Sequence, residues 1–169
     1  MGRDTLTMDE IQYDYYTNLA QLYDTQDLNY PYEWRQYMPS SKEQRIGAIA
    51  ETRFITECLE RNFEPHTPTT PMPWDYIVHC PAGDLKVQVK STSVKFKDKY
   101  YSVSTGTGCT TKAHMSDLVD VVACYAAPIN MWWMIPRSAV SSLVIKLYDD
   151  NSSKSKYMKY QNNWSVYYE

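Results

Sequence analysis

Apolar residues near the start of the chain recur at helical spacing, and they predict a first helix. Thr7 to Glu10 has the form of a capping box, with a hydroxyl at the cap and a carboxylate three residues later. The apolar positions that follow at this spacing are Met8, Ile11, Tyr15, Leu19 and Leu22. An irregular aromatic stretch over residues 28–34 then ends the pattern.

A second helix is expected to begin at Ser40 or Ser41, either of which can cap it, and to end near Arg61. Glu51 falls in the middle of its expected apolar face, which consists of Gly47, Ala48, Phe54, Ile55, Cys58 and Leu59. A carboxylate directed at a core is costly unless a partner stabilises it. Glu51 therefore either reaches water, pairs with a buried arginine or has a function, and the helix alone does not decide.

Alternating residues after a proline-rich connector predict a β-hairpin. The connector covers residues 65–73, and the strands are expected at Trp74–Cys80 and Leu85–Ser91, with a turn over residues 81–84. With a loop of two or four residues, Asp75 pairs with Lys90 and Ile77 pairs with Gln88, which puts Asp75, Gln88 and Lys90 on one face. A slip of one residue would reverse the face of Asp75. Taken alone, this pattern favours an ordinary solvent-facing salt bridge.

The rest of the chain predicts a compact α/β domain. Strands are expected at Tyr100–Ser104, Asp120–Ala126 and Met131–Ile135, and a helix is expected from Pro136 to about Asp149. A length of 169 residues suits one domain. We expect residues 1–40 to form an N-terminal extension, residues 41–148 a core and residues 149–169 a polar C-terminal tail.

Charge and composition narrow the functional classes. The net charge is −3, yet residues 1–40 carry two basic and seven acidic side chains, whereas residues 86–140 carry seven basic and three acidic ones. The basic region permits nucleic-acid binding, although on charge alone a solvated charged face is the favoured explanation. The sequence shows no long apolar run of the kind that predicts a membrane helix and no apolar leader of the kind that predicts secretion. The cytoplasm is therefore the expected compartment.

Cysteine and histidine spacings argue against a zinc site. Cys58, Cys80, Cys109 and Cys124 form no CxxC pair, and we expect reduced thiols. The three histidines show no HxxxH spacing.

The combination of a helical acid, a strand acid and a polar-x-lysine strand resembles the PD-(D/E)XK nuclease superfamily. The similar segments are Gly47–Glu51, Pro73–Asp75 and Gln88–Ser91, within residues 42–136. Two features depart from the family pattern, because Trp74 separates Pro73 from Asp75 and Gln88 replaces an acid. A Gln-x-Lys variant is found among relatives that include phage and bacterial homing endonucleases. The resemblance implies a restriction-endonuclease-like α/β core, in which helices flank a central mixed β-sheet.

This resemblance implies a catalytic set of Glu51, Asp75, Gln88 and Lys90. Mg²⁺, for which Mn²⁺ can substitute, would be held by Asp75, Gln88, Glu51 and the Val89 backbone carbonyl. Lys90 would orient water or stabilise developing charge, and the neutral Gln88 should weaken metal binding. Lysines on or after the same strand would contact DNA: Lys86, Lys95, Lys97, Lys99 and Lys112.

We therefore expect an Mg²⁺-dependent endonuclease that cuts double-stranded DNA. We also expect it to assemble with further copies of itself into a dimer or tetramer. The narrower expectation is a homing endonuclease of phage or bacterial origin. Three alternatives stay open: a Holliday-junction resolvase or restriction enzyme of the same fold, a DNA-binding protein without catalysis, and an interaction protein without a nucleic-acid role. The N-terminal segment and the C-terminal tail are both candidates for base reading or assembly.

Overall fold

The computed structural model describes residues 42–106, 117–149 and 155–169 of the chain. The expected first helix, the aromatic stretch after it and Lys112 lie outside these residues. None of the helices within the described ranges is long and apolar enough to cross a membrane.

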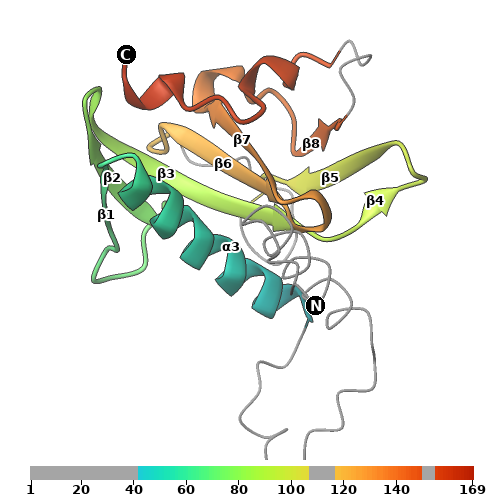
Figure 1. The fold of residues 1–169 in the computed structure, drawn as a ribbon, viewed down its shortest axis with the longest axis horizontal. Helices are drawn as coiled ribbons and strands as arrows, with labels where there is room; N and C mark the ends of the chain where they lie inside the picture. The colour runs from blue at the N-terminus through green and yellow to red at the C-terminus, as the bar shows by residue number, and fades with distance from the viewer. Residues whose placement is uncertain (1–41, 107–116, 150–154) are drawn as a thin grey trace, which may run out of the picture. The chain divides into compact units, whose positions relative to one another are not determined.

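Two β-sheets and one α-helix form the described structure (Figure 1). The central sheet has the strand order β1-β2-β3-β6-β7, and only the β3–β6 pair is parallel. Its strands are β1 (Glu64–His66), β2 (Tyr76–Cys80), β3 (Gly83–Thr92), β6 (Val121–Ala126) and β7 (Met131–Pro136). The small sheet is antiparallel, with the order β4 (Lys95–Phe96), β5 (Tyr100–Ser104) and β8 (Val144–Leu147). The predicted mixed central sheet is confirmed.

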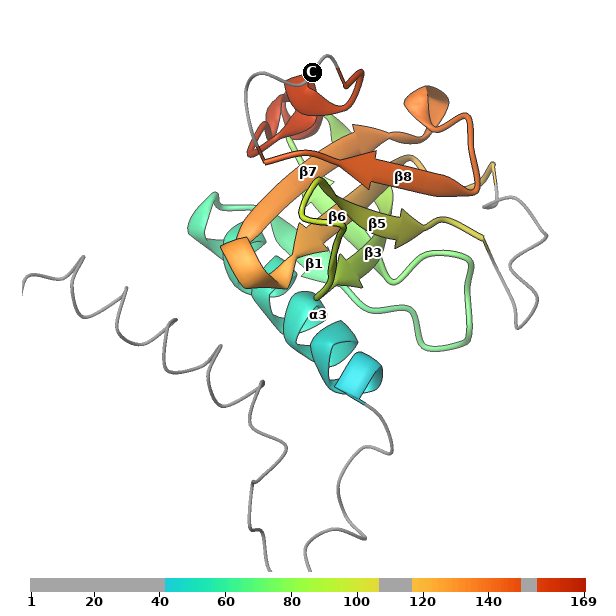
Figure 2. The same cartoon turned by 90° about the vertical axis from the view of Figure 1, so that its right-hand side faces the viewer.

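Each face of the central sheet has its own hydrophobic core. Helix α3 (Lys42–Glu60) covers one face, where Phe54 packs with Val87, Val89 and Met134. The small sheet covers the other face, and the two views agree on this arrangement (Figures 1 and 2). Because both faces are buried, β6 is buried at every position and shows no alternation.

The buried face of α3 differs from the expected one. Ile46, Ala50, Phe54 and Cys58 are buried at a spacing of four residues, whereas Ala48 is exposed and Leu59 is 52 % exposed. The expectation that Glu51 occupies the middle of the apolar face was wrong. Glu51 follows the buried Ala50 and lies at the border of the buried face, so its carboxylate can reach the edge of the sheet.

The β2–β3 hairpin has a different pairing register from the one expected. Cys80 pairs with Gly83, so the loop consists of two residues, and Ile77 lies opposite Lys86 instead of Gln88. Gly83 has a φ of 111°, a conformation that side chains other than glycine rarely adopt. The register is therefore shifted by two residues. Since side chains alternate with a period of two, every residue keeps its predicted face.

The helix expected from Pro136 is replaced by a strand. Pro136 ends β7, the short 3₁₀ helix η2 (Arg137–Ala139) follows, and β8 then completes the small sheet. The alternation of exposed and buried side chains fits a strand and not a helix, since Val144 and Lys146 are exposed whereas Ile145 and Leu147 are fully buried. The small sheet thus takes the place of the second flanking helix.

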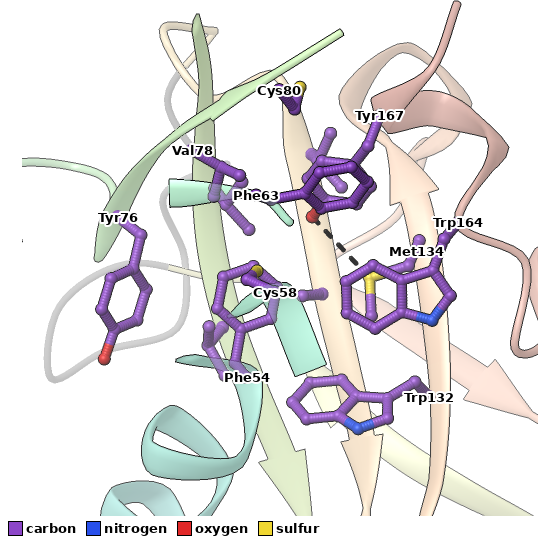
Figure 3. Packing of buried hydrophobic residues seen from close by; sticks show 14 of the residues in the cluster. Phe54, Cys58, Phe63, Tyr76, Val78, Cys80, Trp132, Met134, Trp164 and Tyr167 are labelled. Carbon is purple, nitrogen blue, oxygen red and sulfur yellow. Dashed lines mark hydrogen bonds between the residues drawn. The ribbon is translucent and has the colours of Figure 1, made fainter. Parts of the chain in front are cut away.

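The C-terminal residues are part of the core and do not form the expected polar tail. The short helices η3 (Met158–Tyr160) and η4 (Ser165–Tyr167) bring Trp164 and Tyr167 against the helix side of the sheet (Figure 3). The Trp164 ring stacks on Phe54 with ring centroids 6.0 Å apart, and the Tyr167 hydroxyl lies 3.8 Å from the Met134 sulfur. These aromatic side chains close one end of the α3 core.

Candidate active site

The candidate site lies where β2 begins and β3 continues beyond it. The Asp75 amide donates to the Val87 carbonyl at 2.9 Å, so the backbone of Asp75 still pairs with β3. The Asp75 side chain also pairs with β3, because its Oδ2 accepts the Val89 N–H at 2.7 Å. This second bond fixes the carboxylate beside β3 at the edge of the sheet.

Gln88 and Lys90 project from β3 to the face opposite α3. Their partners on β6 are Val122 and Cys124, which belong to the core beneath the small sheet. Tyr76 belongs to the α3 core, so alternation along the chain places its neighbour Asp75 on the same face as Gln88. The structure thus brings Asp75, Gln88 and Lys90 to one place, despite the shifted register.

Glu51 reaches this place from the other side. It is exposed on α3, and yet partial burial of its carboxylate, followed by the negative charge of Asp75, raises the pKa of Glu51. The positive charge of Lys90 opposes this rise. The charges of Asp75 and Lys90 both act on Glu51, which places the helical acid in the neighbourhood of the acid before β2 and the lysine on β3.

The two carboxylates are held in an environment that disfavours their charge. Burial raises the pKa of Asp75, while the Val89 N–H and Lys90 lower it by a smaller amount. Beneath them, burial and then the two carboxylates raise the pKa of Tyr76 to about 12, which keeps its phenol neutral. Two acids whose ionised forms are destabilised form a place where a bound cation would be stabilised.

Gln88 offers a further oxygen at the same place. It is 8 % exposed, and its Oε1 is buried without a hydrogen-bond partner. Such an orphaned carbonyl is costly unless something binds it. In a strand the N–H and C=O of one residue point to the same side, so the Val89 carbonyl points to the edge where Asp75 accepts the Val89 N–H.

These oxygens fit Mg²⁺ better than a softer metal. The described part of the chain contains no group of three or more histidine, cysteine, aspartate or glutamate side chains that could hold a metal ion. Mg²⁺ usually takes one or two carboxylates from the protein together with neutral oxygens and water. Asp75, Glu51, Gln88 and the Val89 carbonyl are the groups that could supply this combination, and the orphaned Gln88 oxygen is the observation that points to it.

The lysines of this region differ in their surroundings, and Lys90 is the one that the candidate site includes. It is half-buried, and within the described ranges it forms no ion pair shorter than 4.0 Å. Lys95, in contrast, pairs with Asp149 at 2.6 Å. The Lys86 ammonium lies 5.0 Å from the centre of the Trp74 ring. Lys97 and Lys99 are exposed in the turn between β4 and β5.

Sequence reasoning missed two residues that support the site. Asp120 accepts the Lys86 N–H at 2.8 Å through its side chain, and its own N–H donates to the Lys86 carbonyl at 2.8 Å. This exchange holds β3 and β6 in register where the parallel pair begins. Trp74, which interrupts the Pro-Asp pair, is buried in the core beneath the small sheet and anchors the chain before Asp75. An acid at the start of a buried strand was the available signal for Asp120.

Comparison with known proteins supports the fold. No protein-family model and no curated protein matches this sequence. Among solved structures, the chain is similar to a bacterial homing endonuclease, I-Ssp6803I, with a TM-score of 0.63 and 21 % sequence identity. The similarity covers 78 % of this chain and 93 % of that one. The protein therefore has the α/β fold of that endonuclease.

Proposed function

We propose that this protein is a metal-dependent endonuclease that hydrolyses phosphodiester bonds in double-stranded DNA. The observation that carries the proposal is the convergence of Glu51, Asp75 and Lys90 at one edge of the sheet, beside the orphaned carbonyl of Gln88. The fold similarity to I-Ssp6803I, which is described as a homing endonuclease, supports it.

The roles follow from the chemistry of each group. A bound Mg²⁺ would lower the pKa of an attacking water and screen the charge that builds on the phosphoryl oxygens. Asp75 would be the principal ligand, because the Val89 N–H already fixes its orientation. Gln88 and the Val89 carbonyl would add neutral oxygens, and Glu51 would complete the set. Lys90 would orient the water or donate to the developing charge.

The narrower proposal is a site-specific homing endonuclease. The Gln-x-Lys strand and the fold similarity to a bacterial homing endonuclease both favour this role over restriction or junction resolution. A duplex cutter must break two strands, and a dimer or tetramer would present two such sites to one duplex. Equilibrium sedimentation with and without duplex DNA would measure the oligomeric state.

Cleavage of long duplex DNA, including phage genomic DNA, tests the proposal. Reactions with Mg²⁺, Mn²⁺ or EDTA would compare the wild-type protein with Asp75→Ala and Lys90→Ala. Two controls match these variants in charge: Asp84→Ala, on the exposed far end of the hairpin, and Lys159→Ala, on η3. Circular dichroism would check that every variant is folded.

The outcomes separate the candidate functions. Metal-dependent cutting that is lost in Asp75→Ala and Lys90→Ala, and kept in both controls, would support the nuclease and its site. Discrete fragments would favour a homing or restriction role, whereas a smear would count against site specificity. Cutting that survives both site variants would refute the assignment of residues. Tight DNA binding without any cutting would favour a DNA-binding protein that has lost catalysis, with Gln88 as the cause.

A further inference from the structure

The small sheet has an outer face of unusual composition. Its inner face consists of buried Tyr101, Val103, Ile145 and Leu147, so alternation directs the intervening residues of β5 and β8 outward. These residues, with the exposed end of β4, form what we call the outer face: Phe96, Tyr100, Ser102, Ser104, Val144, Lys146 and Tyr148. Phe96 is 47 % exposed and Val144 is 46 % exposed.

Aromatic rings and lysines are interleaved on this outer face. Phe96 and Tyr100 are paired across β4 and β5 with ring centroids 5.3 Å apart, and the Tyr148 ring lies 5.7 Å from that of Tyr100. The Lys146 ammonium lies 4.9 Å from the centre of the Tyr100 ring. Lysines held against aromatic rings keep their charge in water while their stems are ordered.

The hairpin that ends the small sheet adds further positive charge. The Lys99 amide donates to the Phe96 carbonyl at 3.0 Å, and the two residues between them, Lys97 and Asp98, have φ values of 48° and 54°. This tight reversed turn leaves Lys97 and Lys99 exposed at its tip. Asp98 is the one acid of the turn, and Asp149 is already paired with Lys95.

We propose that the outer face of the small sheet and its hairpin tip form a contact surface for double-stranded DNA. This inference rests on the proposed nuclease function and adds to it a surface made of residues other than the proposed metal ligands. Lys97, Lys99 and Lys146 would neutralise phosphates, and the hydroxyls of Ser102 and Tyr100 would donate to phosphate oxygens. Phe96 would make an apolar contact. A two-stranded ribbon such as β4–β5 fits the major groove of B-form DNA.

Charge favours DNA over another copy of this chain as the occupant. In a symmetric dimer the same patch faces itself, so the lysines of both copies would oppose one another. A polyanion meets no such repulsion. The hydroxyls and ammonium groups on this face are also the groups that commonly contact phosphate.

Equilibrium binding at graded salt tests the proposal with a matched pair of variants. The probe is a labelled duplex of random sequence, with EDTA present so that cleavage does not interfere. Lys146→Gln removes the charge that lies 4.9 Å from Tyr100, and Lys159→Gln removes one that lies 4.9 Å from Tyr160 on η3. A third variant, Phe96→Ser, removes the exposed apolar ring without changing charge.

We expect Lys146→Gln to lower the slope of log K against log salt by about 0.9, the value for one lost phosphate contact. Lys97→Gln combined with Lys146→Gln should lower it by about 1.8. Phe96→Ser should weaken binding without altering the slope, and Lys159→Gln should match the wild type. An unchanged slope in the double variant would overturn the proposal, as would a change in oligomeric state that accounts for the loss of affinity.

These results can be distinguished from a failure of the nuclease proposal. A wild-type protein that binds DNA through Lys146 and never cuts would keep the surface and reject the enzyme. A protein that cuts, with no effect of the double variant on the slope, would keep the enzyme and reject the surface. Absence of salt-dependent DNA binding by the wild type would reject both.

Discussion

The Val89 N–H donates a hydrogen bond of 2.7 Å to the carboxylate of Asp75, the residue immediately before β2. The Asp75 side chain accepts an N–H of β3 here, as a backbone carbonyl does within a regular strand pair. The acid is thereby positioned by the sheet itself, and a site that is built on rigid strands holds its geometry better than one on a loop. The same bond lowers the pKa of Asp75, but burial outweighs it and the net shift is upward.

Asp75→Asn should stabilise the metal-free protein at neutral pH. Burial raises the pKa of Asp75 above its ordinary value of 3.8, so ionisation of this carboxyl costs folding free energy. Asparagine carries no charge, and its carbonyl can still accept the Val89 N–H. We expect the melting temperature in EDTA to rise by roughly 1–4 °C. Asp84→Asn, on the exposed far end of the hairpin, is the control.

The same substitution has a defined pH dependence. A carboxyl whose pKa is raised in the folded state binds its proton more tightly there, so stability is lost as pH rises from 3.8 through the folded pKa. The difference in stability between Asp75→Asn and the wild type should therefore be small below pH 3.8 and grow towards neutrality. A difference that is constant across this range would contradict the account.

Gln88→Glu should strengthen metal binding and weaken the metal-free fold. Gln88 is buried, and it directly precedes Val89, whose N–H binds the Asp75 carboxylate. A further acid at this position would add repulsion when no cation is bound. With Mg²⁺ or Mn²⁺ present, the added charge attracts the ion, and we expect an affinity about tenfold higher, or about 1.4 kcal/mol.

Titration calorimetry and melting curves would measure the two effects of Gln88→Glu separately. Glu60→Gln, an exposed change on α3, serves as a control that alters charge away from the site. If Gln88→Glu leaves metal affinity unchanged, the Gln88 side chain is not a ligand, and its orphaned oxygen needs another explanation.

Sequence reasoning placed the candidate-site residues on the correct face of the hairpin because face is a more robust property than register. The register of the hairpin was expected to differ by two residues, so Ile77 was paired with Gln88 instead of Lys86. A two-residue error returns every side chain to its own face, so Asp75, Gln88 and Lys90 still came together. Glu51 was identified for an incorrect reason, since it borders the buried face of α3 and does not lie in its middle.

The elements that were predicted incorrectly depend on packing at long range. Pro136 is typical of a helix start, and the four alternating residues of β8 are too few to outweigh it without their partner β5. The C-terminal aromatics are separated by polar residues with no regular period. Their burial depends on a gap beside α3 and β7 that local patterns do not reveal.

Two thiols should react only after the protein unfolds. Burial raises the pKa of Cys58 and of Cys124 to about 12, so almost no thiolate forms at pH 8. A Cys109→Ser background removes the cysteine that lies outside the described residues. In that background we expect neither thiol to react with Ellman's reagent in native protein, and all three remaining thiols to react in urea. Rapid native labelling of Cys124, identified by mass spectrometry, would refute this packing.

Neighbouring tyrosines near the C-terminus provide the sharpest test of the α3 core. Tyr167 is fully buried, with its ring stacked 5.4 Å from that of Phe63, whereas Tyr168 is 54 % exposed. Removal of a buried aromatic side chain leaves a cavity, so Tyr167→Ala should lower the unfolding free energy by about 3–5 kcal/mol. The Tyr168 ring contacts Phe63 from the surface. Tyr168→Ala should therefore lower the unfolding free energy by less than about 1 kcal/mol. Urea denaturation followed by tryptophan fluorescence would measure both, and equal losses would mean that the C-terminal residues do not belong to the core.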